Sequence, residues 1–287
     1  MTRIKIGIST CPNDTFAFFP LLENLVETEG LTFDFQLMDV QQLNDGLLNQ
    51  DWDVAKASFH AALLVAENYS VFSSGSALGF GNGPLLLAAA TSSPDHWNSE
   101  DQQRSQRNQP LVLCPGQHTT ATLLYRLFYP GSGSIQQVVF SDIMPRLEDG
   151  TADFGVCIHE GRFTYQQQGL HCVEDLGVRW ESETHAPLPL GGILGAKRLG
   201  DEVLQKINRC IHRSVLYAHQ HRQQAFSTMS RYAQELDAEV IWQHVDLYVN
   251  DWTTELGETG EAALHLLAKK AVESKVVGEE IALEIIK

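Results

Sequence analysis

Long apolar runs are missing from this sequence. A helix needs about 20 consecutive apolar residues to cross a bilayer, and the longest apolar stretch, around residues 84–90, has only the length of a strand. The first eight residues alternate as a strand does and contain no apolar core or cleavage site of the secretory kind. We therefore expect a protein that neither spans a membrane nor is exported.

Basic residues are also scarce. The 287-residue chain has 20 Lys and Arg against 36 Asp and Glu, which gives a net charge of −16 at pH 7. Proteins that bind nucleic acid or anionic membranes use cationic side chains to displace counterions from phosphates. Nucleic acid and membrane surfaces are therefore not expected as partners.

Cysteines are few and scattered. The five of them form an odd set without a close pair: Cys11, Cys114, Cys157, Cys172 and Cys210. This pattern fits neither a disulfide framework nor a zinc site. A reducing cytoplasm is the compartment that it favours.

Motifs of the common cofactor-binding and hydrolase folds are absent. The chain has neither G-x-x-x-x-G-K-[ST] nor G-x-S-x-G. The glycines of residues 79–84 precede a proline and a strand, whereas a dinucleotide fingerprint follows a strand and opens a helix. We interpret that segment as a plain turn and expect a site without a metal or an organic cofactor.

The sequence does contain a repeated alternation of strands and helices. Strands are expected over residues 4–8 and 31–37, with a helix over residues 15–27 between them, and a helix over residues 40–48 leads to a strand over residues 54–58. The alternation returns over residues 111–158, and the chain is strongly helical from residue 201. This order predicts an α/β fold with largely parallel strands.

The length favours two lobes. The polar segment 91–110 is the best linker candidate, and the C-terminal helices need a sheet to cover. We predict a first, discontinuous α/β lobe of residues 1–90 and 193–287 and a second α/β lobe of residues 91–192. Two crossings between them would leave a central cleft, the usual place for a small-molecule site.

Two turns between a strand and a helix are candidates for binding an anion, one in each lobe. In the first, S-T-C-P-N-D-T-F (residues 9–16), Asn13 or Asp14 can cap the helix, and the free N–H groups of the helix face the edge of the sheet. In the second, C-P-G-Q-H-T-T-A (residues 114–121), Thr119 and Thr120 offer hydroxyls and N–H groups to a carboxylate. The alternative is that these residues are only helix caps.

A histidine stands at the end of an apolar strand. In I-H-E-G-R-F-T-Y (residues 158–165), His159 lies at the edge where α/β sheets place their ligands. Histidine titrates near neutrality, which suits proton abstraction. The second histidine of H-E-x-x-H is missing, so zinc is disfavoured, and a purely structural histidine is the alternative.

These blocks, together with K-A-S-F, L-P-L-P-L-G-G-I and Y-V-N-D-W-T-T-E-L-G-E-T-G, span nearly the whole chain in a specific order. In that order they resemble the 1,4-dihydroxy-6-naphthoate synthase family of menaquinone biosynthesis by the futalosine route. The resemblance implies a two-lobed, periplasmic-binding-protein-like (type II) fold with a double hinge, used in the cytoplasm as an enzyme. It also implies a carbon–carbon lyase that converts cyclic dehypoxanthinyl futalosine to 1,4-dihydroxy-6-naphthoate, releases dihydroxyacetone and needs no cofactor.

The resemblance also implies roles for particular residues. His159 matches the proton acceptor of the family, Lys56, Ala57 and Ser58 match one substrate-binding run, and Thr119 with Thr120 match the other. We add Asn13 as a further substrate-binding candidate from its place in the first turn.

Two rival functions keep the same fold. One is chorismate dehydratase of the same pathway, which lacks the H-T-T-A and I-H-E-x-R-F-T-Y blocks. The other is a non-catalytic protein that binds a small carboxylate, against which the missing export signal argues. Identification of the product separates all three.

Overall fold

The structure is a computed structural model that describes residues 2–89, 109–159, 161–233, 237–278 and 281–287. The expected linker over residues 91–110 therefore lies almost wholly outside the described residues. Glu160, which strand alternation would turn away from a substrate at His159, also lies outside them.

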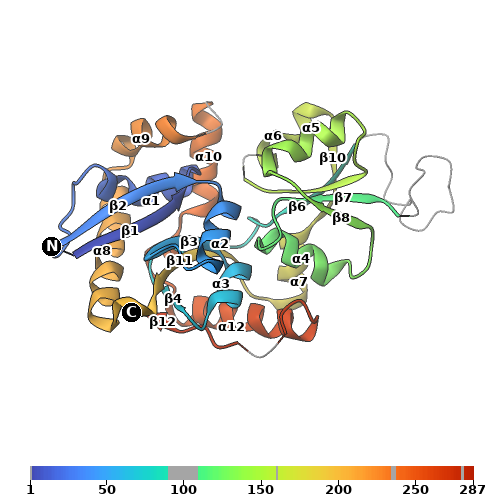
Figure 1. The fold of residues 1–287 in the computed structure, drawn as a ribbon. Coiled ribbons are helices and arrows are strands. Elements are labelled where there is room, and N and C mark those ends of the chain that lie inside the picture. The colour runs from blue at the N-terminus through green and yellow to red at the C-terminus, as the bar shows by residue number, and fades with distance from the viewer. Residues whose placement is uncertain (1, 90–108, 160, 234–236, 279–280) are drawn as a thin grey trace.

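Two mixed sheets stand side by side in two lobes (Figure 1). Within the described residues, the first sheet has the strand order β12-β4-β11-β3-β1-β2, with β5 paired to β11. Its strands are β1 (Thr2–Ser9), β2 (Leu31–Met38), β3 (Val54–Ser58), β4 (Tyr69–Phe72), β5 (Ala77–Gly79), β11 (Leu188–Ala196) and β12 (Ile285–Ile286). The pairs β1–β2 and β1–β3 are parallel, whereas β11 runs antiparallel to its neighbours.

The second sheet has the order β10-β6-β9-β7-β8. Its strands are β6 (Leu85–Ala89), β7 (Leu111–Cys114), β8 (Ser134–Gln137), β9 (Phe154–Cys157) and β10 (Leu170–Asp175). Strand β7 is parallel to β8 and β9, and β6 is antiparallel to β9 and β10. The predicted α/β class is confirmed, with more antiparallel pairing than the sequence pattern predicts.

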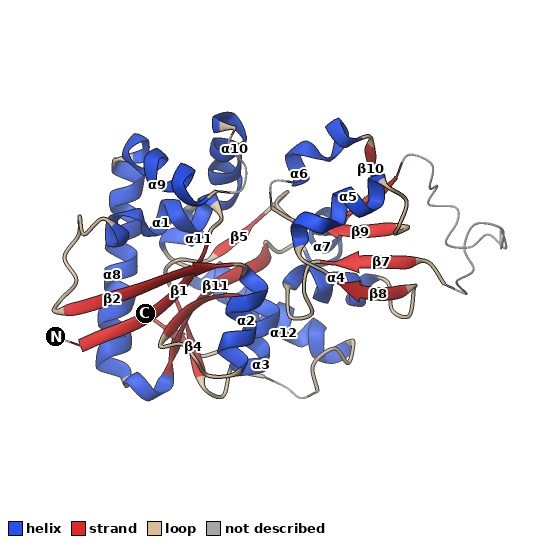
Figure 2. Cartoon of the chain, turned by 45° about the horizontal axis from the view of Figure 1, so that its top comes forward, coloured by secondary structure: helices blue, strands red, loops and turns tan. Residues whose placement is uncertain are grey.

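Helices cover both faces of each sheet (Figure 2). The helices of the first lobe are α1 (Pro12–Leu22), α2 (Val40–Leu48), α3 (Phe59–Val65), α8 (Asp201–Gln220), α9 (Ala225–Tyr232), α10 (Ala238–Tyr248), α11 (Asp251–Thr254) and α12 (Gly257–Glu273). Those of the second lobe are α4 (Thr120–Phe128), α5 (Ile143–Glu148), α6 (Gly161–Thr164) and α7 (Leu176–Thr184).

Strand alternation decides which helices face each side of β1. Ile4, Ile6 and Ile8 are fully buried and pack in one cluster with residues of α1 and α8. Gly7 points to the other face, where an added Cβ would meet Leu43 of α2. Because successive side chains of a strand alternate between faces, the period-2 pattern of the first residues produces this layering.

A second apolar cluster joins the two lobes. It contains Ala55 and Phe59 of the first lobe together with Leu86, Val112 and Val156 of the second sheet. The lobes therefore share part of one core as well as the chain crossings.

Strand membership differs from the lobe boundaries expected from the sequence. Strand β6 falls in the range 1–90 assigned to the first lobe, yet it pairs with β9 and β10 in the second sheet. Strand β11 begins at Leu188, inside the range 91–192, yet it pairs with β3, β4 and β5 in the first sheet. The two crossings between the lobes therefore lie between β5 and β6 and between α7 and β11. The pairing partners of a strand decide which sheet it joins, and the local sequence period does not specify those partners.

Helix α1 is shorter than the expected stretch of residues 15–27. It begins at Pro12 and ends at Leu22, two residues beyond Pro20. Asn24 then adopts a left-handed backbone conformation (φ 55°), which a helix cannot continue through. The proline and this turn together end the helix early.

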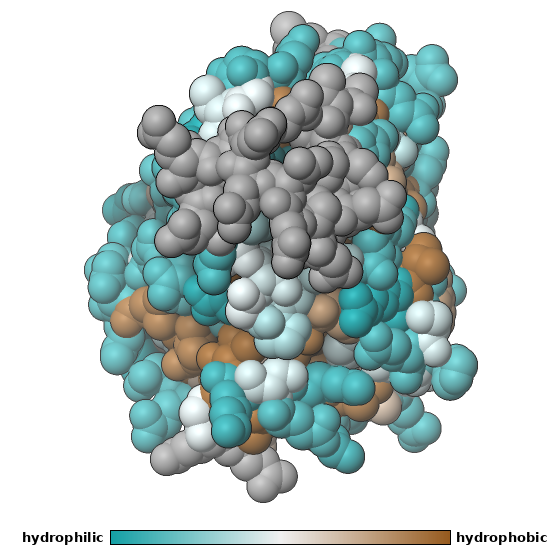
Figure 3. Space-filling model, turned by 90° about the vertical axis from the view of Figure 1, so that its right-hand side faces the viewer, coloured by the Kyte–Doolittle hydropathy of each residue, from teal (hydrophilic) through white to brown (hydrophobic). Residues whose placement is uncertain are grey.

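The face of the second lobe in Figure 3 is largely hydrophilic, with a hydrophobic band below the grey atoms. Among the described residues, none of the helices has the length and apolar character that a membrane span requires.

Candidate active site

A pocket lies between the lobes, at the ends of β1, β3 and β9 and beside β11 and α10. All seven residues singled out from the sequence line it: Asn13, Lys56, Ala57, Ser58, Thr119, Thr120 and His159. The structure thus brings together residues from two segments of the first lobe and two of the second.

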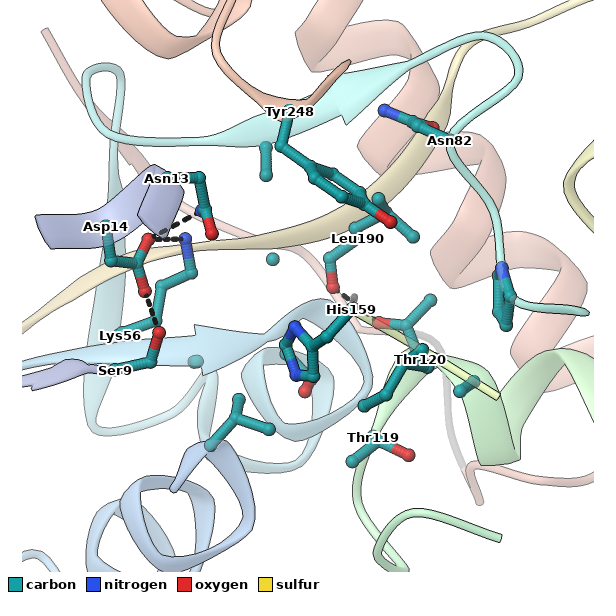
Figure 4. A pocket seen from close by; sticks show the side chains of 18 of the residues that line it. Ser9, Asn13, Asp14, Lys56, Asn82, Thr119, Thr120, His159, Leu190 and Tyr248 are labelled. Carbon is teal, nitrogen blue, oxygen red and sulfur yellow. Dashed lines mark hydrogen bonds and ion pairs between the residues drawn. The ribbon is translucent and has the colours of Figure 1, made fainter. Parts of the chain in front are cut away.

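A buried carboxylate organises the polar end of the pocket (Figure 4). Asp14 Oδ1 accepts hydrogen bonds from Lys56 Nζ at 2.6 Å and from Asn13 Nδ2 at 2.9 Å, and its Oδ2 accepts from Ser9 Oγ at 2.6 Å. The side chains of Lys56 and Asp14 are only 8% and 4% exposed. Buried charges need this kind of pairing, and it holds the ammonium of Lys56 beside the cavity.

The expected cap at this turn is wrong. The N-cap of α1 is Cys11, without a side-chain cap hydrogen bond, and Pro12 occupies the first position of the helix. Asn13 and Asp14 lie inside the first turn, and their side chains bond each other and the pocket residues instead. Proline needs no N–H acceptor at that position, which leaves both polar side chains available to the site.

His159 projects into the pocket from the end of β9. Its backbone is left-handed, with φ 57°, a conformation that is uncommon at non-glycine residues. Its Nδ1 lies 3.3 Å from Cys11 Sγ of the opposite lobe, and the ring of Phe140 packs against it edge-on at 4.8 Å. The imidazole is thus held by both lobes.

His244 of α10 is a pocket residue that lies outside the motifs recognised in the sequence. It is 1% exposed, its ring stacks on that of His159 with centroids 6.1 Å apart, and its Nε2 lies 2.9 Å from Asn13 Oδ1. Burial, with the charges of His159 and Lys56, holds the pKa of His244 well below its usual value. In the sequence, only its position on the apolar face of α10 distinguishes His244, and a histidine buried in the core for structural reasons gives the same pattern.

Thr119 and Thr120 stand at the N-terminus of α4, as predicted. Thr119 is the N-cap: its Oγ1 accepts from Thr122 N at 3.2 Å and donates to Gly116 O at 2.8 Å. The Thr120 hydroxyl donates to Leu190 O at 2.7 Å. The hydroxyl protons are therefore committed to the protein, contrary to the expectation that they face a carboxylate, and the first N–H groups of the helix are the donors left for a ligand.

Ser58 is fixed by a residue of α2. Its backbone N donates to Asn44 Oδ1 at 3.0 Å, and its Oγ accepts from Asn44 Nδ2 at 3.2 Å. Asn44 is fully buried and its Nδ2 also reaches His118 O of the second lobe at 3.4 Å. One amide thus orders a pocket residue and contacts the opposite lobe.

The remaining wall is mostly apolar. Val40, Ala77, Pro84, Leu190 and the ring of Tyr248 line it. The segment interpreted as a plain turn contributes Asn82, Gly83 and Pro84, so its position at a lobe crossing makes it part of the site. A ligand with an apolar body and a few polar groups matches such a lining.

Arg162 in the I-H-E-G-R-F-T-Y block supports this crossing. Its Nη1 donates to Gly83 O at 2.6 Å, and its Nη2 pairs with Asp175 Oδ2 at 2.5 Å. Asp175 in turn caps α7 through the N–H groups of Gly177 and Val178. Arg162 therefore ties the end of the pocket to the fold of the second lobe.

Among the described residues of this site, metal ligands do not converge. Across the part of the chain that the structure describes, His, Cys, Asp and Glu form no group of three or more that could hold a metal ion.

Comparison with known proteins identifies the family to which the chain belongs. The family model described as menaquinone biosynthesis matches residues 4–273. A 1,4-dihydroxy-6-naphthoate synthase of Thermus thermophilus is 38% identical over 272 residues, covering 94% of each chain, and one of Streptomyces coelicolor is 36% identical over 279 residues, covering 95% of this chain and 94% of the relative. The chain belongs to the menaquinone biosynthesis family. The resemblance inferred from the sequence blocks is confirmed.

Solved structures agree on the fold. A protein of Archaeoglobus fulgidus superposes with a TM-score of 0.85 at 28% identity, over 96% of this chain and 98% of the other. An alkanesulfonate-binding protein of Xanthomonas axonopodis bound to MOPS superposes with a TM-score of 0.70 at 11% identity, over 99% of this chain and 96% of the other. The two-lobed, periplasmic-binding-protein-like fold expected for this family member is confirmed.

Proposed function

We propose that this protein is a 1,4-dihydroxy-6-naphthoate synthase, a lyase that converts cyclic dehypoxanthinyl futalosine to 1,4-dihydroxy-6-naphthoate and dihydroxyacetone. The observation that carries the proposal is the position of His159 in a pocket that both lobes line. Two relatives of this name at 36–38% identity over nearly the whole chain support it. They favour it over chorismate dehydratase and over a binding protein without catalytic activity.

In this proposal His159 is the general base. Removal of one proton lets the oxygenated ring system fragment, and the aromatic naphthalene that forms drives the reaction. The protein has to position the substrate and accept the proton. The contact of His159 Nδ1 with Cys11 across the cleft orients the ring only when the lobes meet.

The other pocket residues bind the two ends of the substrate. The N–H groups at the start of α4, next to Thr119 and Thr120, receive the carboxylate of the ring system. Lys56, Ser58 and Asn13, at the polar end, receive its hydroxyl groups. Ala57 also lines the cavity.

Product analysis tests the proposal. The purified protein is incubated separately with cyclic dehypoxanthinyl futalosine and with chorismate, and the products are identified by mass spectrometry. Formation of 1,4-dihydroxy-6-naphthoate from the first substrate alone is expected. Dehydration of chorismate, or binding without turnover, would support one of the two rival functions instead.

We further propose that the enzyme works in the cytoplasm on a small carboxylate and has no nucleic-acid or membrane partner. The acidic composition and the five cysteines, which form no disulfide, support this placement. Fractionation of cells that express the native gene, with immunodetection of the protein, tests it.

A further inference from the structure

A chain of hydrogen bonds runs from α10 to the ammonium of Lys56. His244 Nε2 lies 2.9 Å from Asn13 Oδ1, Asn13 Nδ2 donates to Asp14 Oδ1 at 2.9 Å, and Lys56 Nζ donates to the same oxygen at 2.6 Å. These four residues come from three elements that lie far apart in the sequence. The sequence motifs account for Lys56 and Asn13, whereas nothing in them accounts for His244.

The direction of each bond in this chain is fixed. A carboxylate only accepts, so Asp14 forces the amide nitrogen of Asn13 to face it and turns the amide oxygen toward His244. Nε2 of His244 must therefore carry the proton and donate. The preceding bonds thus select one tautomer of a buried, neutral imidazole.

The packing around His244 favours a precise position. The residue is 1% exposed, and the centroid of its ring lies 4.6 Å from that of Tyr248 and 6.1 Å from that of His159. A side chain so enclosed has few alternative rotamers. It can therefore hold the Asn13 amide more rigidly than solvent could.

From this geometry we propose that His244 is a positioning residue of the active site. Its N–H holds the amide of Asn13, and through Asn13 it holds the Asp14 carboxylate in the orientation that directs the Lys56 ammonium into the pocket. The inference rests on the proposed function. It assigns His244 an effect on substrate binding through Lys56 and leaves proton transfer to His159.

A double-mutant cycle between His244 and Lys56 tests this inference. His244→Phe keeps a ring in the same space but removes the donor, and Lys56→Met removes the ammonium. We expect His244→Phe to raise KM about tenfold and to change kcat less than threefold, because the lost interaction acts on binding and not on the base. In the Lys56→Met background the same change should raise KM less than twofold.

Matched variants separate the loss of the positioning hydrogen bond from a general loss of stability. His244→Gln retains an N–H donor and should have a KM close to that of the wild type. His265→Phe, which changes an exposed histidine of α12, should alter neither KM nor kcat. If His244→Phe does not fold, His244→Met removes the same donor with a more adaptable side chain and replaces it in the cycle. Melting temperatures of all variants show which of them are folded.

The outcomes are distinct. Equal KM effects of His244→Phe in both backgrounds, or a His244→Gln variant as impaired as His244→Phe, would overturn the inference while leaving the proposed function intact. A wild-type enzyme that forms no naphthoate would contradict the proposed function and the inference together. Loss of the His244 effect in the Lys56→Met background would establish the link.

Discussion

At the scale of single residues, His159 combines an unusual backbone conformation with contacts to both lobes. A left-handed conformation at a non-glycine residue costs of order 1–3 kcal/mol and persists only where the surroundings enforce it. Here the ring is held by Cys11 and Phe140, at 3.3 Å and 4.8 Å. Such an arrangement fits the proposed role of His159 as a base, because a base needs a fixed position relative to the substrate more than a relaxed backbone.

His159→Asn should lower kcat by roughly 100-fold or more, because asparagine keeps some hydrogen bonding but has no basic nitrogen. Binding of the product, measured by titration calorimetry, should be nearly unchanged. Steady-state kinetics with the purified variant measure the loss. Near-normal turnover of His159→Asn, or complete loss of activity in Glu160→Gln alone, would show that the base lies elsewhere.

His60 of α3 makes stability depend on pH. Burial lowers the pKa of His60 from 6.5 to about 4, despite the hydrogen bond from its Nδ1 to Thr119 O. Below pH 6.5 the unfolded chain binds a proton that the folded protein does not bind until about pH 4, so folding stability falls as the pH decreases through this window. A shift of this size corresponds to about 3 kcal/mol.

We therefore expect His60→Gln to flatten the pH dependence of stability. The free energy of unfolding is measured in urea at pH 7 and at pH 4.5. Its decrease between these two pH values should be smaller in the variant than in the wild type by about 2 kcal/mol. Equal falls in both proteins would mean that His60 is not held neutral.

At the scale of elements, the N-terminus of α4 has two tasks. Thr119 caps the helix, and the first residues of the helix line the pocket, where we propose that their N–H groups bind the ligand. Loss of such a cap costs about 1 kcal/mol of stability. Stability and ligand binding can therefore be separated by the choice of substitution.

Thr119→Ala combined with Thr120→Ala should weaken ligand binding by about 1–3 kcal/mol, because the helix start loses both its cap and its anchor to Leu190 O. Thr119→Ser keeps the capping oxygen and is the control expected to bind normally. KM and the product dissociation constant measure the effect. A double variant with unchanged KM and kcat would remove this helix start from the binding site.

The elements also show which features local sequence can predict. The period of residues 40–48 and 54–58 predicts α2 and β3 with the observed bounds, because each has a strong amphipathic or apolar pattern. The sheet membership of β6 and β11 depends on pairing with distant strands, which no local period encodes. His244 was missed for a similar reason: only the tertiary contact with Asn13 distinguishes it from a core residue.

At the scale of the whole molecule, the lobes meet along a polar seam next to the pocket. His118 N donates to Gln41 Oε1 at 3.2 Å, and His60 Nδ1 reaches Thr119 O at 3.2 Å. Gly116, with φ 116°, lies so close to Gln41 that an added Cβ would collide with the Gln41 side chain. A side chain at this position would therefore have to displace that of Gln41 in the closed cleft.

Closure of the lobes on a ligand should be visible by small-angle X-ray scattering. Addition of 1,4-dihydroxy-6-naphthoate should reduce the radius of gyration of the wild type, since its binding groups lie on both lobes. Gly116→Ala should weaken this change and raise KM. Gly150→Ala, which also places alanine at positive φ but meets no neighbouring atom, is the matched control.

Identical scattering profiles with and without product would contradict closure in solution. If Gly116→Ala and Gly150→Ala had the same change in radius of gyration and the same KM, the seam would not limit closure.

The stoichiometry of the products formed by the wild-type enzyme tests the proposed reaction directly. Cyclic dehypoxanthinyl futalosine is converted to completion without added cofactor, and both products are quantified by liquid chromatography and mass spectrometry. One 1,4-dihydroxy-6-naphthoate and one dihydroxyacetone are expected for each substrate molecule consumed. Unconverted substrate, or an aromatic product without the three-carbon fragment, would contradict the proposed reaction.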